Sequence, residues 1–248
     1  MSSLARIKQA ARQTYQQLWY FNIPIVTPQI IAVYPHDPRA FTQGLVFEQG
    51  CLYESTGLIG ESTVRRLSFE HAIPELSHPL EDHWGEGIAC NREQLIQLTW
   101  QSQIAMVYRL TDLQPITELP YQGEGWGLAS IDDGFVMTDG SERLQFLNHH
   151  FEVVSDVRVM IKGKPLRWLN DLIFANGSLY INRLSDHFIY QVSPLSGQVE
   201  RIIDCSYIVA IEQPSGNEDV LNGIAFNQQQ QQFIITGKRW SQLFVVTF

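Results

Sequence analysis

Short runs of apolar residues separated by polar turns recur along most of this chain. Runs of this length, divided by Gly, Asn, Asp and Gln, are typical of β-hairpins rather than helices. Five segments share one pattern: a polar or aromatic residue, then Gly (Asp once), then Leu or Ile, an apolar run, a polar turn and a second apolar run. They are Gln43–Gly57, Glu86–Trp100, Trp126–Gly140, Asn170–Leu184 and Asn222–Lys238.

The spacing of these segments predicts the architecture. They begin 43, 40, 44 and 52 residues apart. The residues between them carry two further strand patterns per unit, at Thr63–Glu70 and Pro74–Pro79, Ile104–Thr111 and Pro115–Pro120, Arg143–Asn148 and Val153–Met160, His187–Ser193 and Val199–Asp204. Four strands every 40–50 residues or so is the period of a β-propeller blade. The pattern therefore predicts an all-β, five-bladed β-propeller.

The fifth unit lacks one strand, because only Leu243–Phe248 follows its hairpin. Gln29–Tyr34 has a strand pattern, so we expect an N-terminal strand to complete the last blade and close the ring, which removes an exposed sheet edge. Before it, apolar residues at helical spacing predict an amphipathic helix on the outside of the propeller, with a helix lying on a membrane surface as the alternative. We expect a helical extension over residues 1–27 and the propeller domain over residues 28–248.

Composition and charge narrow the range of partners. The 248 residues include 26 acidic and 17 basic side chains, for a net charge of −9. Because the chain is acidic and has no Lys/Arg-rich run, we expect no nucleic-acid partner. No apolar stretch is long enough to span a bilayer. The N-terminus has no signal peptide as written, so we expect a cytoplasmic location, with export open if the N-terminus has been trimmed. A closed propeller needs no partner, and we expect a monomer.

Cysteine usage gives no sign of a metal centre. Cys51, Cys90 and Cys205 lie far apart, and no Cys/His spacing of a zinc site is present. We interpret the three residues as buried thiols.

The repeat also predicts where a functional site would lie. In a propeller the first strand of each blade lines the central channel, so equivalent residues converge at one mouth. The residues that open the five units are Gln43, Glu86, Trp126, Asn170 and Asn222. The second strand of each hairpin returns toward the same end and brings Trp100 and Lys238 nearby. We expect one polar and aromatic pocket there, of the kind that suits a small ligand.

Glu86 is the one acid among the opening residues. Between Gly85 and Gly87 and beside Trp84, its carboxyl would be partly desolvated, which raises a carboxyl pKa and suits proton exchange near neutral pH. Alternatively, Glu86 accepts backbone N–H bonds at a loop. Alternatively, the Lys238 side chain is simply exposed to solvent, and Trp100 and Trp126 fill the core.

Nine short motifs occur in register with the repeats: Tyr34–Leu45 (YPHDPRAFTQGL), Tyr53–Gly57 (YESTG), Gly85–Ala89 (GEGIA), Gln97–Trp100 (QLTW), Glu124–Leu128 (EGWGL), Asp139–Ser141 (DGS), Leu169–Leu172 (LNDL), Val220–Phe226 (VLNGIAF) and Thr236–Trp240 (TGKRW). In these motifs the chain resembles the plant- and bacterial-type glutaminyl-peptide cyclotransferases (glutaminyl cyclases). The resemblance covers about residues 30–248.

The resemblance implies a five-bladed propeller and an acyltransferase-class enzyme. Such an enzyme closes the N-terminal glutaminyl residue of a peptide or small substrate to a pyroglutamyl residue and releases ammonia. The family needs no metal for catalysis. A structural calcium in the channel is associated with some members, and this sequence does not identify ligands for it.

The resemblance also implies roles for single residues. Glu86 matches the proton-transfer acid/base of the family, and Asn170 and Lys238 match groups expected to bind the amide or the oxyanion. Trp100 and Trp126 match pocket tryptophans. Substrate binding is further expected from Gln43, from Asn222, and from Trp84, which stands where the family usually has Phe.

Two departures from the family pattern bear on function. The chain has Asn170-Asp171-Leu172-Ile173 where the family has NELE, and it has Leu184, preceded by Arg183, where the family has a pocket tryptophan. These departures motivate an alternative, a non-catalytic propeller that binds peptide termini or small ligands at the same mouth. A calcium-dependent, lactonase-like hydrolase is a third hypothesis.

Overall fold

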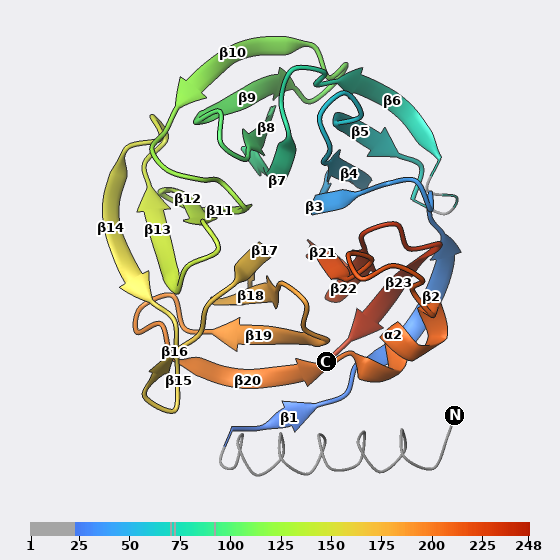
Figure 1. The fold of residues 1–248 in the computed structure, drawn as a ribbon, viewed down its shortest axis with the longest axis vertical. Helices are drawn as coiled ribbons and strands as arrows, with labels where there is room; N and C mark the ends of the chain where they lie inside the picture. The colour runs from blue at the N-terminus through green and yellow to red at the C-terminus, as the bar shows by residue number, and fades with distance from the viewer. Residues whose placement is uncertain (1–22, 70, 72, 92) are drawn as a thin grey trace.

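A computed structural model describes residues 23–69, 71, 73–91 and 93–248. The described residues form five antiparallel sheets arranged as blades around a central channel (Figure 1). This arrangement confirms the five-bladed, all-β propeller. The predicted helix over residues 1–27 falls mostly outside the described residues. At the end of that range, Ile25–Val26 is a short strand, β1.

Blades 1 to 3 each consist of four strands that follow one another along the chain. Blade 1 is β3 (Thr42–Glu48), β4 (Cys51–Thr56), β5 (Thr63–Leu67) and β6 (Pro74–Pro79). Blade 2 is β7 (Gly85–Asn91), β8 (Gln94–Thr99), β9 (Ile104–Arg109) and β10 (Pro115–Pro120). Blade 3 is β11 (Gly127–Ile131), β12 (Gly134–Thr138), β13 (Arg143–Leu147) and β14 (Val153–Arg158).

The last two blades each take a strand from the N-terminal part of the chain. Blade 4 is β17 (Leu169–Ala175), β18 (Ser178–Arg183), β19 (Phe188–Val192) and β20 (Val199–Asp204), with β1 added in parallel to β20. Blade 5 is β21 (Leu221–Asn227), β22 (Gln232–Gly237), β23 (Gln242–Thr247) and β2 (Gln29–Pro35). Strand β2 pairs antiparallel with β23, which confirms ring closure by an N-terminal strand.

Three elements lie outside the predicted pattern. A small hairpin, β15 (Met160–Ile161) and β16 (Lys164–Pro165), connects blades 3 and 4. Helix α2 (Ser206–Glu212) lies between β20 and β21 and accounts for the longer spacing before the fifth repeat. It is the one helix in the described part of the chain. No helix among the described residues has the length and apolar character needed to cross a membrane.

The core lies between neighbouring blades. Each of the five apolar clusters found among the described residues is shared by two adjacent blades. In one of them, for example, Leu45 and Leu52 of blade 1 pack with Ile234 and Leu243 of blade 5. A sheet that is covered on both faces needs apolar residues on both sides of its strands, which explains the continuous apolar runs in the inner hairpins.

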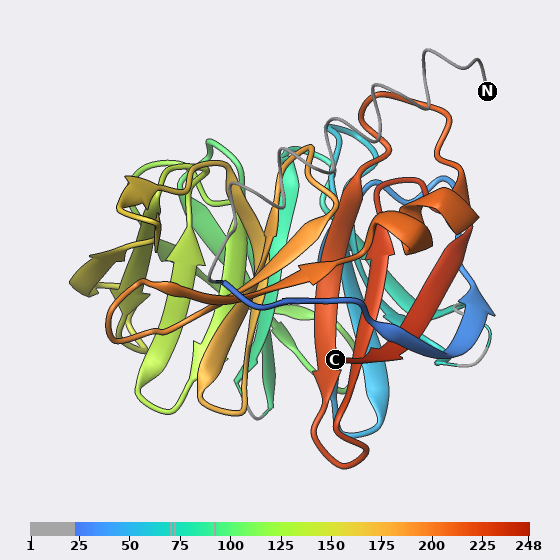
Figure 2. The same cartoon turned by 90° about the horizontal axis from the view of Figure 1, so that it is seen from below.

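The orientation of the strands fixes the two ends of the channel. Figure 2 shows the molecule from the side, with the turns of the inner hairpins, such as β17–β18 and β21–β22, at one end. The loops that lead into the innermost strands lie at the other end. The first residues of the five repeats are therefore brought to a single mouth.

Candidate active site

A pocket of about 350 Å³ opens at the mouth where the repeats begin. It is lined by Phe41, Gln43, Trp84, Glu86, Trp100, Trp126, Asn170, Leu184, Ser185, Asn217, Glu218, Val220 and Lys238. Seven of the eight residues singled out from the sequence are among these, and only Asn222 is not. The volume falls in the range of small-molecule sites.

The glycine that follows the opening residue of a repeat explains why the innermost strands of neighbouring blades lie so close together at this mouth. A Cβ atom on Gly87 would lie 2.5 Å from the Cα atom of Gly127, and one on Gly44 would lie 2.9 Å from the backbone nitrogen of Ile88. Side chains at these positions would push the innermost strands apart. The glycines therefore let neighbouring blades approach at the axis, which places the preceding residues, Gln43, Glu86 and Trp126, side by side.

Glu86 lies at the bottom of the pocket and is 6% exposed. The Gln43 Nε2 donates a hydrogen bond to Glu86 Oε1 at 2.8 Å. Burial raises the pKa of the Glu86 carboxyl well above its ordinary value, Lys238 opposes this rise, and the negative charges of Glu124 and Asp171 add to it. A carboxyl with a raised pKa exchanges protons closer to neutral pH than an exposed glutamate does.

Lys238 is buried as well and places a cation on the opposite side of the pocket. Its Nζ lies 4.6 Å from the centroid of the Phe41 ring, within the range of a cation–π contact. Burial lowers the pKa of Lys238, and the negative charges of Glu86 and Glu218 partly offset that effect. The interpretation of Lys238 as an exposed side chain is therefore wrong for this structure.

Three tryptophans form the aromatic wall. Trp84 lies between Phe41 and Trp100, with ring-centroid separations of 5.8 and 5.6 Å and near edge-to-face geometry. All three tryptophans (Trp84, Trp100 and Trp126) line the pocket. They are pocket residues rather than core fillers.

Glu124 holds two of these indoles in place. Its Oε2 accepts a hydrogen bond from Trp100 Nε1 at 2.8 Å and another from Trp126 Nε1 at 3.1 Å. Its second oxygen accepts from Gln101 Nε2 at 3.0 Å, and these bonds keep the pKa of Glu124 below its ordinary value. Sequence reasoning noted Glu124 only as part of a motif. Its place two residues before Trp126 was the available signal.

Asp171 takes the position that glycine occupies in the other repeats. Its carboxyl is fully buried, and Oδ2 accepts backbone N–H bonds from Ile224 at 2.8 Å and Leu45 at 3.3 Å. Blade 4 is thereby tied across the axis to blades 5 and 1. Burial raises the pKa of Asp171 well above its ordinary value, more than these bonds lower it.

The two asparagines of the ring have different surroundings. Asn170 is buried against the pocket, and its Oδ1 has no hydrogen-bond partner among the described residues. Asn222 does not line the pocket. Its Nδ2 donates to the backbone oxygens of Thr42 and Gln43, at 2.9 and 3.2 Å, so it ties β21 to β3.

The remaining lining residues were not predicted as site residues. Phe41 precedes β3, and Ser185, Asn217, Glu218 and Val220 belong to loops outside the repeated hairpins. Phe41 and Val220 stand two residues before the opening residues Gln43 and Asn222, the offset that separates Trp84 from Glu86, so the repeat did carry a signal for them. Ser185, Asn217 and Glu218 follow no such period. Leu184, which appeared from the sequence as a departure from the family pattern, lines the pocket.

The residues near the channel axis offer few oxygen ligands for a structural calcium ion. The unpartnered oxygens near the axis belong to the carboxamides of Gln43, Asn170 and Asn222 and to one carboxyl, Asp171. Calcium takes six to eight oxygen ligands or so, usually including several carboxylates. The described residues contain no group of three or more His, Cys, Asp or Glu side chains placed to hold a metal ion. This donor set does not fit calcium well, and the ion stays a prediction.

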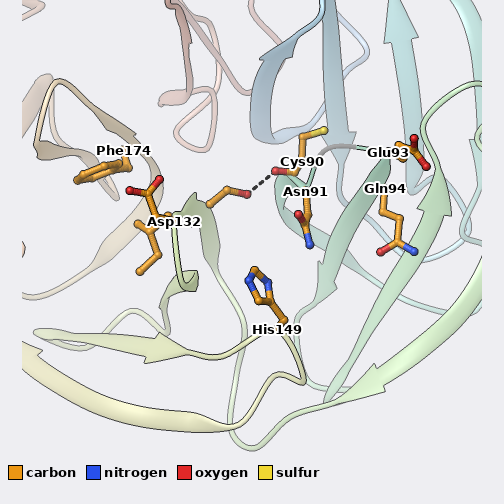
Figure 3. Close-up of a pocket in the computed structure, with 9 residues that line it drawn as sticks. Cys90, Asn91, Glu93, Gln94, Asp132, His149 and Phe174 are labelled. Atoms are coloured by element: carbon orange, nitrogen blue, oxygen red, sulfur yellow. Dashed lines mark hydrogen bonds between the residues drawn. The ribbon is translucent and has the colours of Figure 1, made fainter.

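A second cavity, of about 860 Å³, lies at the opposite end of the channel and is shown in Figure 3. Its walls come from the far ends of inner strands, including Cys90 and Asn91 of β7, and from turns that carry Asp132 and His149. The labelled side chains lie around the edge of an open cavity. Burial raises the pKa of Cys90 to about 12, so its thiol stays protonated. This cavity lacks the converging charged and aromatic groups of the first pocket.

The cysteines bear out their interpretation in part. The three cysteines form no disulfide among the described residues; Cys90 and Cys205 are buried, whereas Cys51 is half-buried.

Comparison with known proteins gives a consistent result. The family model described as glutamine cyclotransferase matches residues 2–248. The chain is 31% identical over 224 residues to a glutaminyl-peptide cyclotransferase of Arabidopsis thaliana, covering 88% of this chain and 70% of that protein. The crystal structure of Myxococcus xanthus glutaminyl cyclase superposes with a TM-score of 0.87 at 36% identity, covering 91% of this chain and 98% of the other.

Proposed function

This chain belongs to the glutamine cyclotransferase family, and from that premise we propose that its pocket converts N-terminal glutaminyl residues of peptides to pyroglutamyl residues with release of ammonia. The observation that carries the proposal is that Glu86, the one buried carboxyl among the residues lining the pocket, shares that pocket with the buried Lys238 and three tryptophans. The reaction is an acyl transfer in which the acceptor nitrogen belongs to the substrate itself.

The main task of the enzyme in this cyclisation is the transfer of one proton. The free α-amine attacks the side-chain amide carbon of the same residue, a C–N bond forms, and the C–NH₂ bond breaks to give ammonia. Because a five-membered ring is formed, the substrate already holds its two reacting groups close together. The attacking nitrogen has to lose a proton, and the leaving nitrogen has to gain one.

Glu86 is the group placed for that transfer. As a carboxylate it accepts a proton from the attacking nitrogen, and as a carboxylic acid it returns the proton to the leaving nitrogen. Burial raises its pKa above the ordinary value, which brings its proton exchange closer to neutral pH. The Gln43 amide fixes one carboxyl oxygen, which holds the carboxyl in place at the pocket.

The polar atoms without partners match the substrate's own groups. Gln43 Oε1 and Asn170 Oδ1 are unpartnered acceptors, and an α-amine and a primary amide both present N–H donors. Lys238 supplies positive charge toward the carbonyl oxygen, which becomes negative as the tetrahedral intermediate forms. The tryptophans exclude water and cover the aliphatic part of the side chain.

The first test is mass spectrometry of a Gln-Ala-Ala peptide incubated with the purified protein. We expect the mass of one ammonia to be lost, and we expect Glu86→Gln to reduce the rate to that of spontaneous cyclisation. A repeat with a chelator tests our proposal that the proton transfer needs no cofactor. The matched control is Glu48→Gln, a partly buried glutamate on the same inner layer of strands but at the other end of β3.

The alternative, a non-catalytic propeller that binds peptide termini, would show binding of the peptide without ammonia release. The presence of Glu86, Lys238 and the three tryptophans in one pocket favours the enzyme. Normal turnover by a folded Glu86→Gln variant would show that Glu86 does not transfer the proton.

A further inference from the structure

An exposed tryptophan stands at the rim of the pocket, outside the set of residues carried over from the family. The Trp168 ring packs against the Trp126 ring at a centroid distance of 6.2 Å and an interplanar angle of 41°. The carbonyl of Trp168 accepts a hydrogen bond from the backbone nitrogen of Leu184 at 2.8 Å. Trp168 therefore lies between two residues that line the pocket, Trp126 and Leu184.

The contribution of Trp168 to the fold does not explain its presence. The side chain is 52% exposed, so about half of its apolar surface remains in water. Its backbone adopts φ of +67°, a left-handed conformation that bulky side chains rarely adopt and that costs roughly 1 kcal/mol. A glycine or asparagine would fit this backbone better. A large indole kept exposed in such a conformation indicates a surface used for binding.

The charges next to this indole are already paired. Arg167 forms an ion pair with Glu142 at 3.0 Å, and Arg183 forms one with Asp186 at 3.0 Å. The Arg183 Nε also donates to the backbone oxygen of Arg167 at 2.9 Å. These paired charges flank Trp168 and Leu184, whose own side chains supply the apolar surface at this rim.

We propose that Trp168 and Leu184 form an apolar subsite for the side chain of the substrate's second residue, the one that follows the glutaminyl residue. The inference rests on the proposed function. With the first residue inside the pocket, the chain has to leave through the mouth, and the next Cα is about 3.8 Å further on. The second side chain therefore meets the rim.

The test compares ammonia release from Gln-Phe-Ala, Gln-Ala-Ala and Gln-Gly-Ala. We expect the wild type to process the Phe peptide with a kcat/KM about tenfold above that of the Gly peptide, the range of discrimination that an open hydrophobic contact provides. Trp168→Gly, which relieves the backbone strain, should abolish this preference, so that the Phe and Gly peptides are processed with equal kcat/KM. Trp168→Phe should keep part of the preference. Leu195→Ala is the control, because Leu195 is 92% exposed on an outer turn of blade 4.

The outcomes separate this inference from the proposed function. No ammonia release from any peptide would overturn the proposed function. Release at one rate from all three peptides would leave the cyclase activity intact and overturn the subsite. A preference that survives in Trp168→Gly would also overturn it, as would a wild-type preference for Gln-Lys-Ala over Gln-Phe-Ala, which would indicate a cation-binding rim.

Discussion

At the scale of single residues, Glu124 couples the shape of the pocket to its electrostatics. One carboxylate oxygen accepts hydrogen bonds from both Trp100 and Trp126, so the two indoles cannot reorient independently. The same carboxylate lies close enough to Glu86 to raise its pKa. These two effects can be separated by two substitutions, one that keeps an acceptor oxygen and one that does not.

Glu124→Ala should weaken substrate binding because it removes the acceptor for both indole N–H groups. We expect KM for Gln-Ala-Ala to rise by about tenfold, the equivalent of roughly 1.4 kcal/mol. Glu124→Gln keeps an amide oxygen at the same place and should leave KM within about twofold, since a neutral acceptor weakens but does not remove such bonds. Steady-state kinetics with the three proteins checks this, and an equal rise of KM in both variants would contradict it.

Glu124→Gln should also change the pH dependence. The carboxylate form of Glu86 starts the reaction, so kcat/KM rises with pH through the pKa of Glu86. Removing the negative charge of Glu124 removes one cause of the raised pKa, because a like charge disfavours ionisation. The rising limb of the pH–rate profile should therefore move to lower pH. An unchanged limb, or one moved to higher pH, would show that Glu86 does not control it.

At the scale of elements, the repeat predicted the strands that all blades have in common. It did not predict the elements in the connections between blades. All five inner hairpins fall where the pattern put them. Close packing at the axis requires Gly after the opening residue at positions such as Gly44 and Gly87, whereas the fourth repeat has Asp171 there. The β15–β16 hairpin and helix α2 are too short and too irregular to give a period. The pocket loops that carry Ser185 and Asn217 escaped prediction for the same reason.

A buried charge cluster joins the connection between β2 and β3 to the strands of blade 1, and the motifs that contain several of its residues did not predict it. Glu54 on β4 is fully buried and accepts hydrogen bonds from Arg65 Nε at 2.8 Å, Thr42 Oγ1 at 2.6 Å and His36 Nε2 at 3.0 Å. The other ring nitrogen of His36 donates to the Trp240 carbonyl at 2.8 Å. His36 follows β2 and Trp240 precedes β23, so this cluster fastens blade 1 to the closing strands of blade 5.

Glu54→Gln should destabilise the fold because it removes the anionic partner of His36 and leaves Arg65 with only Asp37, at 3.2 Å. Breaking a buried pair in this way costs about 3–5 kcal/mol of unfolding free energy. The control is Glu75→Gln, because Glu75 is 47% exposed and pairs with Arg66 on the surface, so its loss should cost at most about 1 kcal/mol. Urea denaturation at pH 6 measures both values, and equal losses in the two variants would contradict the role of the cluster.

The same cluster sets a pH window for stability. The pKa of Glu54 lies below its ordinary value because of Arg65 and His36, even though burial opposes this. Its contribution is therefore present above about pH 4.5 and is lost as the pH falls. The pKa of His36 is raised by Glu54 and the Trp240 carbonyl against the effect of burial, so its contribution is present below about pH 6.5 and is lost as the pH rises through the folded-state value. Wild-type stability measured across this range should fall on both sides, and Glu54→Gln should flatten the curve.

At the scale of the whole molecule, ring closure depends on one strand that is distant in sequence from its partners. Strand β2 pairs with β23 through Ala32–Val245 and Val33–Phe244, among other residues. Its side chains alternate, so that Ile30, Ala32 and Tyr34 pack on the core and the residues between them face water. Because the pocket takes residues from all five blades, opening the ring at β2 should disrupt the site as well as the last blade.

Two neighbouring substitutions test this closure. Ala32→Asp places a charge on the inner face of β2 and should lower the unfolding free energy by about 2–4 kcal/mol, because a buried unpaired carboxyl is costly. Ile31→Asp, one residue away on the 48%-exposed outer face, should change it by no more than about 0.5 kcal/mol. In urea, tryptophan fluorescence and cyclase activity should be lost together in all three proteins, since the pocket tryptophans belong to the ring that β2 closes. Activity that persists after the fluorescence transition in Ala32→Asp would show instead that the pocket does not depend on a closed ring.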